Sequence, residues 1–239
     1  MPLLQQSARC RTNLMTTKRL ITFLLPVTLG LSISVNGQRT KVNLSDLFAF
    51  YKQEVKNLNL IEGDTLLDIG SGEGMVNAMY SVVQNNLHQV LMDTDPKTMN
   101  KKNVSNSYKA VFKSYKSKNT FSFDLIYNTE DSMPLNDKSF HKILCRRSFH
   151  EFKKPEAMLG EIHRILKDTG FVVVIEGVPR MPNDIDPTCK LEYLRADTII
   201  KIFTKNRFQL VSYMEETMPF DNNRKLSVLT FKKDTANIN

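Results

Sequence analysis

The sequence predicts an α/β protein built on one doubly wound sheet, because a buried strand runs into a glycine-rich turn and then a helix. Residues 65–69 form a short apolar run, typical of a strand buried on both faces. Glycines stand at 70, 72 and 74, where that strand must end, and residues 75–83 carry apolar side chains at helical spacing. This succession predicts a ligand-binding corner, since glycines allow close backbone approach and a helix N-terminus offers unpaired N–H groups.

The rest of the chain continues the alternation of strands and helices. The predicted elements, in chain order, are a helix over 43–58 with Asn43 as its cap, the corner at 65–83, a strand over 88–93, a helix over 97–116, a strand over 123–127, a strand that ends at Cys145, a helix over 156–167, a strand over 171–176, a helix over 195–208 and a hairpin with strands over 208–214 and 226–232. Residues 177–192 contain three prolines and are expected as an irregular segment at the C-terminal edge of the sheet.

Several polar residues stand where strands end, and each has a functional and a structural interpretation. Asp93 ends the second strand, where a carboxylate can accept hydrogen bonds from both hydroxyls of a ribose. Asp95 follows closely and can instead cap the next helix. His150 follows the fourth strand and is a candidate general base, or else a histidine hydrogen-bonded at a loop corner. Tyr51 can face the ligand or belong to the core stripe of its helix.

The charge of the chain argues against nucleic acid as a partner. The 239 residues have a net charge of +8, but residues 1–37 carry four basic residues and no acid, so the remainder has +4. The other lysines are scattered, without a basic stripe interleaved with aromatic residues. A solvated basic surface is therefore the expected interpretation, and the partner that we expect is a small molecule.

The N-terminal segment has the organisation of an export signal. Lys18 and Arg19 precede an apolar run over residues 20–35, and small or modest residues then precede Gln38. The run is shorter than the ~20 apolar residues that a membrane-spanning helix needs. We therefore expect residues 1–37 to be a cleaved signal or, alternatively, an uncleaved membrane anchor, and residues 38–239 to be one domain. This predicts a periplasmic or secreted protein, and a cytoplasmic one if the signal is not used.

Only two cysteines follow the predicted signal, and they give no metal motif. Cys145 lies in an apolar strand and is expected as a buried thiol, while Cys189 lies in the irregular segment. Two cysteines neither establish nor exclude an oxidising compartment. No C-x-x-C pair or His/Cys cluster is visible along the sequence, so no metal site is expected.

The spacing of the glycines decides between ligands. A dinucleotide fingerprint would need its third glycine at position 75, which is Met75, so a nicotinamide-dependent oxidoreductase is disfavoured. An acid two residues before the first glycine, followed by G-x-G-x-G, resembles the first motif of the class I S-adenosylmethionine-dependent methyltransferases, with Asp68, Gly70, Gly72 and Gly74 as the matching residues. The stretch from Glu161 to Gly170 is also similar to that family's E-x-x-R-x-L-K-P-G-G ending. A tight turn without a ligand is the alternative.

The resemblance extends over roughly residues 43–233 and implies a Rossmann-like sheet of seven strands, mostly parallel with an antiparallel last strand. It implies S-adenosylmethionine as the cofactor. The residues then expected to bind it are Asp68, Gly70, Ser71, Gly72, Gly74, Asp93, Thr94, Thr129, Glu130, Asp131 and Arg146. The family usually has an acid at the position of Thr129, and Glu130 and Asp131 are the substitutes expected for it. His141 replaces another acid of the family that is usually structural.

The implied function is transfer of the sulfonium methyl group to a small-molecule acceptor, with His150 as the base if the acceptor must lose a proton. One alternative is a non-catalytic binding module that keeps this fold outside the cytoplasm, since the cofactor is made in the cytosol. Nucleic-acid methylation is another alternative, which a steep salt dependence of RNA binding would support. The sequence names neither the acceptor nor the oligomeric state.

Overall fold

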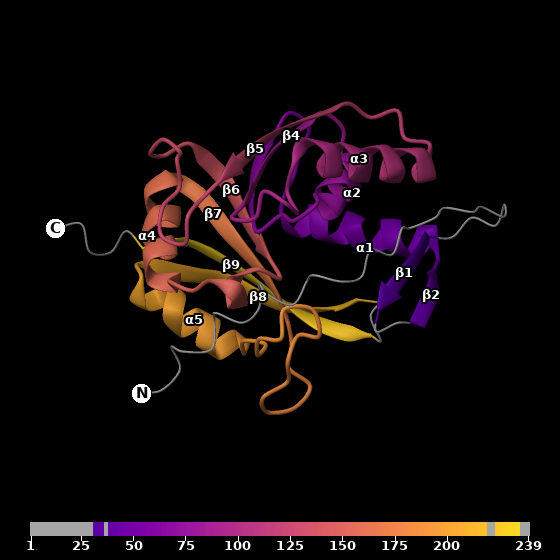
Figure 1. The fold of residues 1–239 in the computed structure, drawn as a ribbon. Coiled ribbons are helices and arrows are strands. Elements are labelled where there is room, and N and C mark those ends of the chain that lie inside the picture. Colours follow the sequence, from indigo (N-terminus) through magenta and orange to yellow (C-terminus); the bar gives the residue numbers. More distant parts are fainter. Residues whose placement is uncertain (1–30, 36–37, 219–222, 235–239) are drawn as a thin grey trace.

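The fold is taken from a computed structural model of the chain, which describes residues 31–35, 38–218 and 223–234 (Figure 1). Its elements are β1 (Leu31–Val35), β2 (Gln38–Val42), α1 (Leu44–Asn57), β3 (Thr65–Ile69), α2 (Met75–Val83), β4 (Leu87–Asp93), α3 (Lys101–Tyr115), β5 (Phe121–Tyr127), β6 (Phe140–Arg146), the 3₁₀ turn η1 (Phe149–Glu151), α4 (Pro155–Ile165), β7 (Leu166–Gly177), α5 (Ala196–Lys205), β8 (Phe208–Met218) and β9 (Arg224–Lys233).

Seven strands form one sheet in the order β5-β4-β3-β6-β7-β9-β8. The five strands β5, β4, β3, β6 and β7 are parallel to one another, whereas β9 is antiparallel to both β7 and β8. This confirms the predicted fold class, including the antiparallel last strand. The strand order reverses between β3 and β6, and the crevice beyond the carboxyl ends of these strands is where doubly wound sheets bind ligands.

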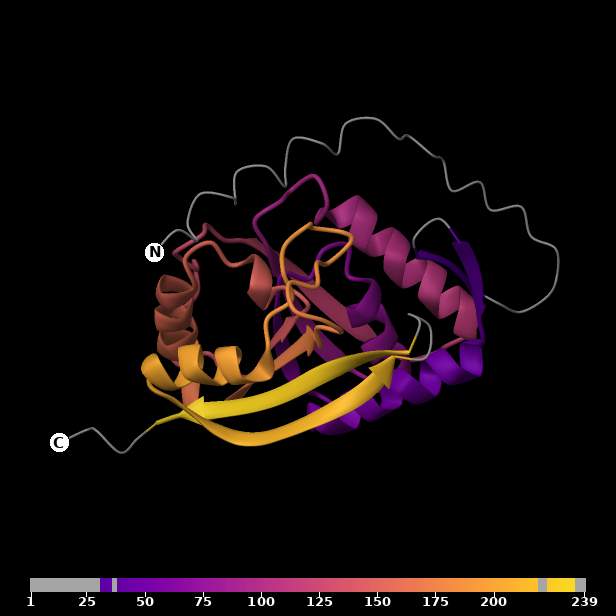
Figure 2. The same ribbon diagram turned by 90° about the horizontal axis from the view of Figure 1, so that it is seen from below.

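The sheet lies between two helical layers. Helices α1, α2 and α3 pack on one face and α4 and α5 on the other, as the two apolar clusters and Figures 1 and 2 show. Leu66 belongs to the first cluster and its neighbour Leu67 to the second, and both are completely buried. A strand covered on both faces must be apolar at successive positions, which explains the continuous apolar runs of β3 and β7.

The ends of several elements differ from the predicted ones for local reasons. The helix predicted from residue 97 begins only at Lys101, because Asn100 caps it by accepting a hydrogen bond from the Asn103 amide at 3.0 Å. Helix α4 ends at Ile165 rather than 167, since Leu166 is already extended and opens β7. The hairpin strands are longer than predicted, because pairing between β8 and β9 continues as far as Met218 and Arg224.

The N-terminal prediction falls mainly outside the described residues. Of residues 1–37, the structure describes only Leu31–Val35, which pairs as β1 with Gln38–Val42 in an antiparallel two-stranded sheet. The export signal therefore stays a prediction. Within the described residues, every helix is too short or too polar to span a bilayer.

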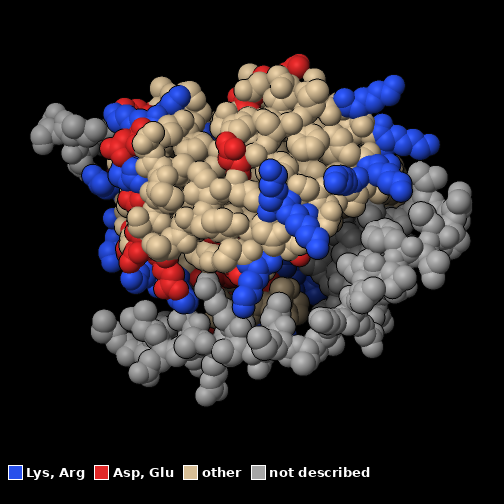
Figure 3. Space-filling model, turned by 45° about the horizontal axis from the view of Figure 1, so that its top comes forward, with Lys and Arg blue, Asp and Glu red and all other residues tan. Residues whose placement is uncertain are grey.

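Charged residues are spread out rather than gathered into a stripe on the face seen in Figure 3. On the face shown in Figure 3, some lysine and arginine side chains stand apart on uncharged surface and others alternate with acids. The basic side chains that form ion pairs with acids include Lys138, Lys153, Lys154 and Lys225. This arrangement agrees with the expected solvated surface.

Candidate cofactor site

The turn after β3 is shaped by three glycines with positive φ, and each meets a different environment. A Cβ on Gly70 would lie 2.4 Å from the Ser148 Cβ, so this glycine lets the segment after β6 approach the turn. A Cβ on Gly74 would lie 2.7 Å from Leu91 Cδ2, so this glycine lets α2 pack against the sheet. Gly72 has φ +56° and nothing within 4 Å of the position of a Cβ. Gly72 therefore leaves open space that a ligand can occupy.

Asp93 ties the glycine turn to the end of β4. Its Oδ2 accepts a hydrogen bond from the Gly72 amide at 3.1 Å, and its Oδ1 accepts one from the Asp95 amide at 2.9 Å. A carboxylate has about four acceptor positions, so these two bonds leave acceptor capacity on both oxygens. The half-buried side chain is thus held in a fixed orientation and still able to bind two hydroxyls.

A pocket opens at the carboxyl ends of β3, β4 and β5, beside the switch point. Of the predicted residues, it is lined by Gly70, Asp93, Thr94, Thr129 and Glu130. Asp68, Ser71, Gly72, Gly74, Asp131 and Arg146 are not among the lining residues. Sequence reasoning missed Ile69, Asn128 and Met158 among the other walls, whereas the segment after β6, of which residues between 147 and 153 line the pocket, resembles a family segment that borders the methyl group. The strand-end rule that identified Asp93 would also have selected Asn128, the residue directly after β5.

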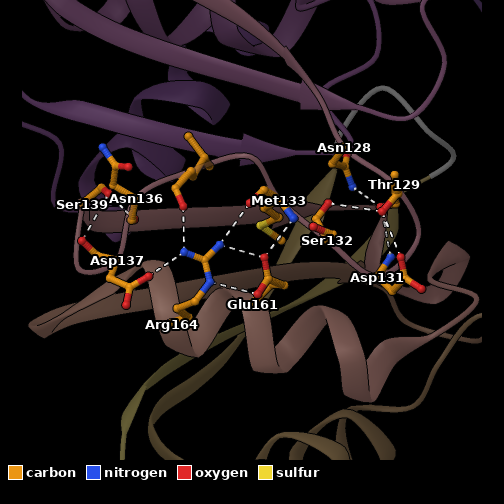
Figure 4. A network of polar contacts seen from close by, with 11 residues as sticks. Asn128, Thr129, Asp131, Ser132, Met133, Asn136, Asp137, Ser139, Glu161 and Arg164 are labelled. Atoms are coloured by element: carbon orange, nitrogen blue, oxygen red, sulfur yellow. Dashed lines mark hydrogen bonds and ion pairs between the residues drawn. The ribbon is translucent and has the colours of Figure 1, made fainter.

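The edge of the pocket beyond β5 contains an acceptor without a partner. Among the described residues, no group hydrogen-bonds to the buried Asn128 Oδ1, although Asn128 Nδ2 donates to the Thr129 carbonyl at 2.8 Å. The predicted substitutes are engaged elsewhere, since Glu130 pairs with Lys153 and Asp131 pairs with Lys154. Thr129 donates to Asp131 Oδ1 at 2.9 Å (Figure 4). Asn128 is therefore the group at this edge best placed to accept from a ligand amino group.

The loop that carries this edge is clamped by α4. Figure 4 shows the Arg164 guanidinium donating to the Met133 carbonyl at 3.0 Å and to Asp137 at 2.6 Å. Glu161 accepts from the Met133 amide at 2.9 Å and from Arg164 at 2.7 Å. The E-x-x-R pattern noted in the sequence thus has a structural role, because residues three apart on a helix share one face. It fixes the loop that borders the pocket.

Asp68 lies beneath the turn, buried on the face covered by α2. Its Oδ2 accepts from Asn77 Nδ2 at 2.9 Å, whereas Oδ1 has no hydrogen-bond partner among the described residues. Burial, which disfavours the charged form, raises the pKa of Asp68 to about 7, although the bond from Asn77 acts in the opposite direction. An orphaned carboxylate oxygen under a glycine turn fits a ligand that carries a positively charged amino group.

We predict that Asp68 makes the stability of the ligand-free protein fall as the pH rises. The folded chain keeps the Asp68 proton up to about pH 7, whereas the unfolded chain loses it near pH 4. Between these values the folded state holds more protons, so the free energy of unfolding decreases with rising pH across this window. Denaturant titrations at pH 5 and pH 8 measure the difference, and Asp68→Asn should flatten it. An unchanged pH profile in the variant would contradict this assignment.

Arg146 belongs to a buried ion pair rather than to the pocket wall. Its guanidinium donates to both carboxylate oxygens of Glu54, which is completely buried, with one contact of 2.9 Å. Tyr80 donates to the same carboxylate at 2.8 Å. The Arg146 guanidinium also lies 5.6 Å from the ring centre of Tyr51, which is buried in the core. This cluster joins α1 to the end of β6, and binding of the cofactor by Arg146 stays a prediction.

His150 lies on η1 with both ring nitrogens engaged. Nδ1 is 2.9 Å from Glu176 Oε2, and Nε2 is 3.3 Å from Cys189 Sγ. Burial lowers the pKa of His150, but its contacts with Cys189 and Glu176 raise it by more, to about 10. A general base must be unprotonated, so the role of His150 as a base requires that the ring first lose this proton, and the role stays a prediction.

The comparisons with known proteins agree with this site. Residues 67–174 match the protein-family model described as Methyltransferase domain. The fold is similar to a SAM-dependent methyltransferase from Aquifex aeolicus, with 18% identity, a TM-score of 0.55 and coverage of 79% of this chain and 93% of that one. A SAM-dependent methyltransferase from Methanosarcina mazei gives 16% identity, a TM-score of 0.58 and coverage of 75% and 96%.

A third similar structure has a different activity in its name. The [4+2]-cyclase SpnF shares 16% identity, with a TM-score of 0.60 and coverage of 87% of each chain. The search of curated proteins returned no match. At such identities the structural likeness establishes the fold alone. The family match identifies residues 67–174, which include the strand ends that form the pocket, as similar to a methyltransferase domain. The chain thus has the fold of SAM-dependent methyltransferases, and S-adenosylmethionine is the cofactor that this domain implies.

Proposed function

We propose that this chain is an S-adenosylmethionine-dependent methyltransferase whose acceptor is a small molecule. The observation that carries the proposal is the succession of groups along three neighbouring strand ends. Gly72 leaves room above the turn after β3, Asp93 has acceptor capacity at the end of β4, and Asn128 has an unpartnered oxygen after β5. These would meet, in order, the amino-acid part, the ribose hydroxyls and the adenine amino group of the cofactor.

The bound cofactor supplies a methyl group that is already activated by its sulfonium charge. The work left to the chain is to orient the two reactants and to exclude water from them. Asp93 would fix the ribose, and the loop clamped by Glu161 and Arg164 would hold the adenine edge. The segment after β6 lines the same pocket and would border the acceptor.

Two alternatives keep the fold but differ in chemistry. A non-catalytic binding module would bind a nucleoside-like ligand in the same pocket without turning it over. A reaction other than methyl transfer is the second alternative, because a cyclase is among the similar structures. Binding of the cofactor must therefore be followed by a test of turnover.

Calorimetric titration of the full chain with S-adenosylmethionine, S-adenosylhomocysteine and NAD tests the proposal. We expect micromolar affinity for the first two ligands and no binding of NAD. Incubation with S-adenosylmethionine and pools of small-molecule acceptors should then release S-adenosylhomocysteine. A folded chain that binds neither adenosyl compound would refute the proposal, and binding without release in any pool would favour the non-catalytic alternative.

A further inference from the structure

Three side chains with metal-binding atoms converge next to the pocket, although no metal motif is visible in the sequence. His150 and Glu151 come from η1, and Cys189 comes from the segment between β7 and α5, 39 residues away. One nitrogen, one oxygen and one sulfur atom of these residues all lie within 4.8 Å of one another. The sequence analysis expected no metal site. The tertiary structure nevertheless brings together possible ligands that are far apart in the chain.

The distances are close to those of a tetrahedral site. Cys189 Sγ lies 3.3 Å and Glu151 Oε1 lies 4.0 Å from His150 Nε2. Zinc binds His nitrogen at about 2.0–2.1 Å and Cys sulfur at about 2.3 Å. In a tetrahedron these bond lengths separate the two ligand atoms by about 3.5 Å. The His150–Cys189 pair already has nearly this spacing. The Glu151 oxygen, which lies within 4.8 Å of the other two atoms, would have to move closer, and its half-exposed side chain has room to rotate.

The histidine is also oriented as metal-bound histidines are. Its Nδ1 lies 2.9 Å from a carboxylate oxygen of Glu176, which is completely buried on β7. A second-shell carboxylate of this kind fixes the imidazole and makes its other nitrogen a better ligand. Glu176 also accepts a hydrogen bond from the His150 amide at 3.2 Å. The ring is therefore held with Nε2 directed toward Cys189.

The cysteine is presented by a loop with its own fixed geometry. Asp186 accepts a hydrogen bond from the Thr188 amide at 2.7 Å and pairs with Arg147 at 2.9 Å, which ties the loop to the end of β6. Ile185 and Glu192 form a bridge across the loop base. Cys189 is thus a buried side chain on a loop with fixed geometry. Figure 2 shows the course of the segment between β7 and α5.

We propose that His150, Glu151 and Cys189 bind a Zn²⁺ ion, with Glu176 as the positioning residue behind His150. A donor set of one nitrogen, one sulfur and one carboxylate oxygen suits this borderline-soft ion, whereas magnesium and calcium prefer oxygen ligands alone. Three protein ligands leave the fourth position open, which is the arrangement of catalytic rather than structural zinc sites.

The open position is next to the proposed reaction, since Glu151 both lines the pocket and belongs to the metal ligands. If the proposed methyltransferase function holds, this position is where a thiol or hydroxyl of the acceptor would bind. On binding, the acceptor would release its proton to solvent and remain on zinc as the anion. His150 would then serve as a ligand, and no side-chain base would be needed.

Zinc content measures the site directly. The full chain, prepared without a histidine tag, is loaded with Zn²⁺, desalted and analysed for metal by mass spectrometry. We expect about one zinc ion per chain, lost in Cys189→Ala and in His150→Ala. Glu176→Gln should weaken zinc binding by about 10–100-fold. After Co²⁺ loading, an intense thiolate-to-metal absorption band should appear in the wild type and be absent in Cys189→Ala.

Matched controls use the same residue types elsewhere. Cys145→Ala removes a buried thiol in β6, His88→Asn removes a histidine bonded to Ser122, and Cys10→Ser removes a thiol outside the described residues. All three should retain zinc.

Equal zinc content in the wild type and Cys189→Ala, with no rise in Tm on adding Zn²⁺, would overturn the proposal. Titration with S-adenosylmethionine in parallel separates the two proposals, because cofactor binding without zinc refutes only the metal site and zinc without cofactor binding refutes only the proposed function.

Discussion

Gly72→Val is expected to abolish binding of S-adenosylmethionine while leaving a folded domain. Gly72 has nothing within 4 Å of the position of a Cβ, so a valine side chain would start in open space and extend into the space assigned to the cofactor. We expect the affinity to fall by about a hundredfold or more, which corresponds to about 3 kcal/mol. Isothermal titration calorimetry measures the loss, and circular dichroism checks the fold.

Gly63→Val is the matched control for backbone strain. Gly63 also has positive φ and open space around a Cβ, but it lies in the turn before β3, at the opposite end of the strand from Gly72. Left-handed backbone costs an L-residue roughly 1–2 kcal/mol, so both variants should lower Tm by similar amounts. Only Gly72→Val should lose the cofactor. If both variants bind equally well, or if Gly72→Val alone unfolds, the turn is chiefly structural.

Asp93→Ala is expected to weaken cofactor binding by more than about tenfold. A hydrogen bond to a charged group contributes about 1.5–3 kcal/mol, and the carboxylate is proposed to accept from both ribose hydroxyls. The variant also loses the bonds from the Gly72 and Asp95 amides, so the glycine turn would be less well fixed. Asp93→Asn keeps one acceptor oxygen and should lie between the wild type and Asp93→Ala in calorimetry.

Asp95→Ala separates ribose binding from the general loosening of this loop. Asp95 accepts from the Lys97 amide at 3.0 Å and from the Thr98 hydroxyl at 2.8 Å, and it does not line the pocket. Its removal should lower stability with little effect on cofactor affinity. If the two alanine variants weaken binding equally, Asp93 acts through loop order and not through contact with the ribose.

The main architecture could be predicted from the sequence because it depends on local patterns. The apolar run of β3, the three glycines after it and the helical spacing of α2 are adjacent in the chain, and the observed helix has the predicted bounds. Asp93 could be placed because strand ends in a parallel sheet meet at one edge. The start of α3 and the end of α4 could not be predicted in this way, because they are set by the N-cap at Asn100 and by the extended backbone of Leu166.

The site was predicted less completely, because its walls come from segments that only the fold brings together. Asn128 was passed over in favour of the acids at 130 and 131, and the structure pairs these with Lys153 and Lys154. Arg146 was expected at the cofactor, which stays a prediction, and the structure adds the counter-charge that a buried arginine needs, Glu54 of α1. Neither pairing follows from sequence distance.

The sequence by itself determined the sheet, the glycine turn and the acid at the next strand end, since each depends on neighbouring residues and on the period of a strand or helix. Only the tertiary structure decided which polar groups face the pocket and which satisfy one another. The meeting of His150 and Glu176 with Cys189 is the clearest case. This contact forms only because the fold places strand β7 and the following loop beside η1. Buried polar atoms have no water to bind, so they form hydrogen bonds with other groups of the protein.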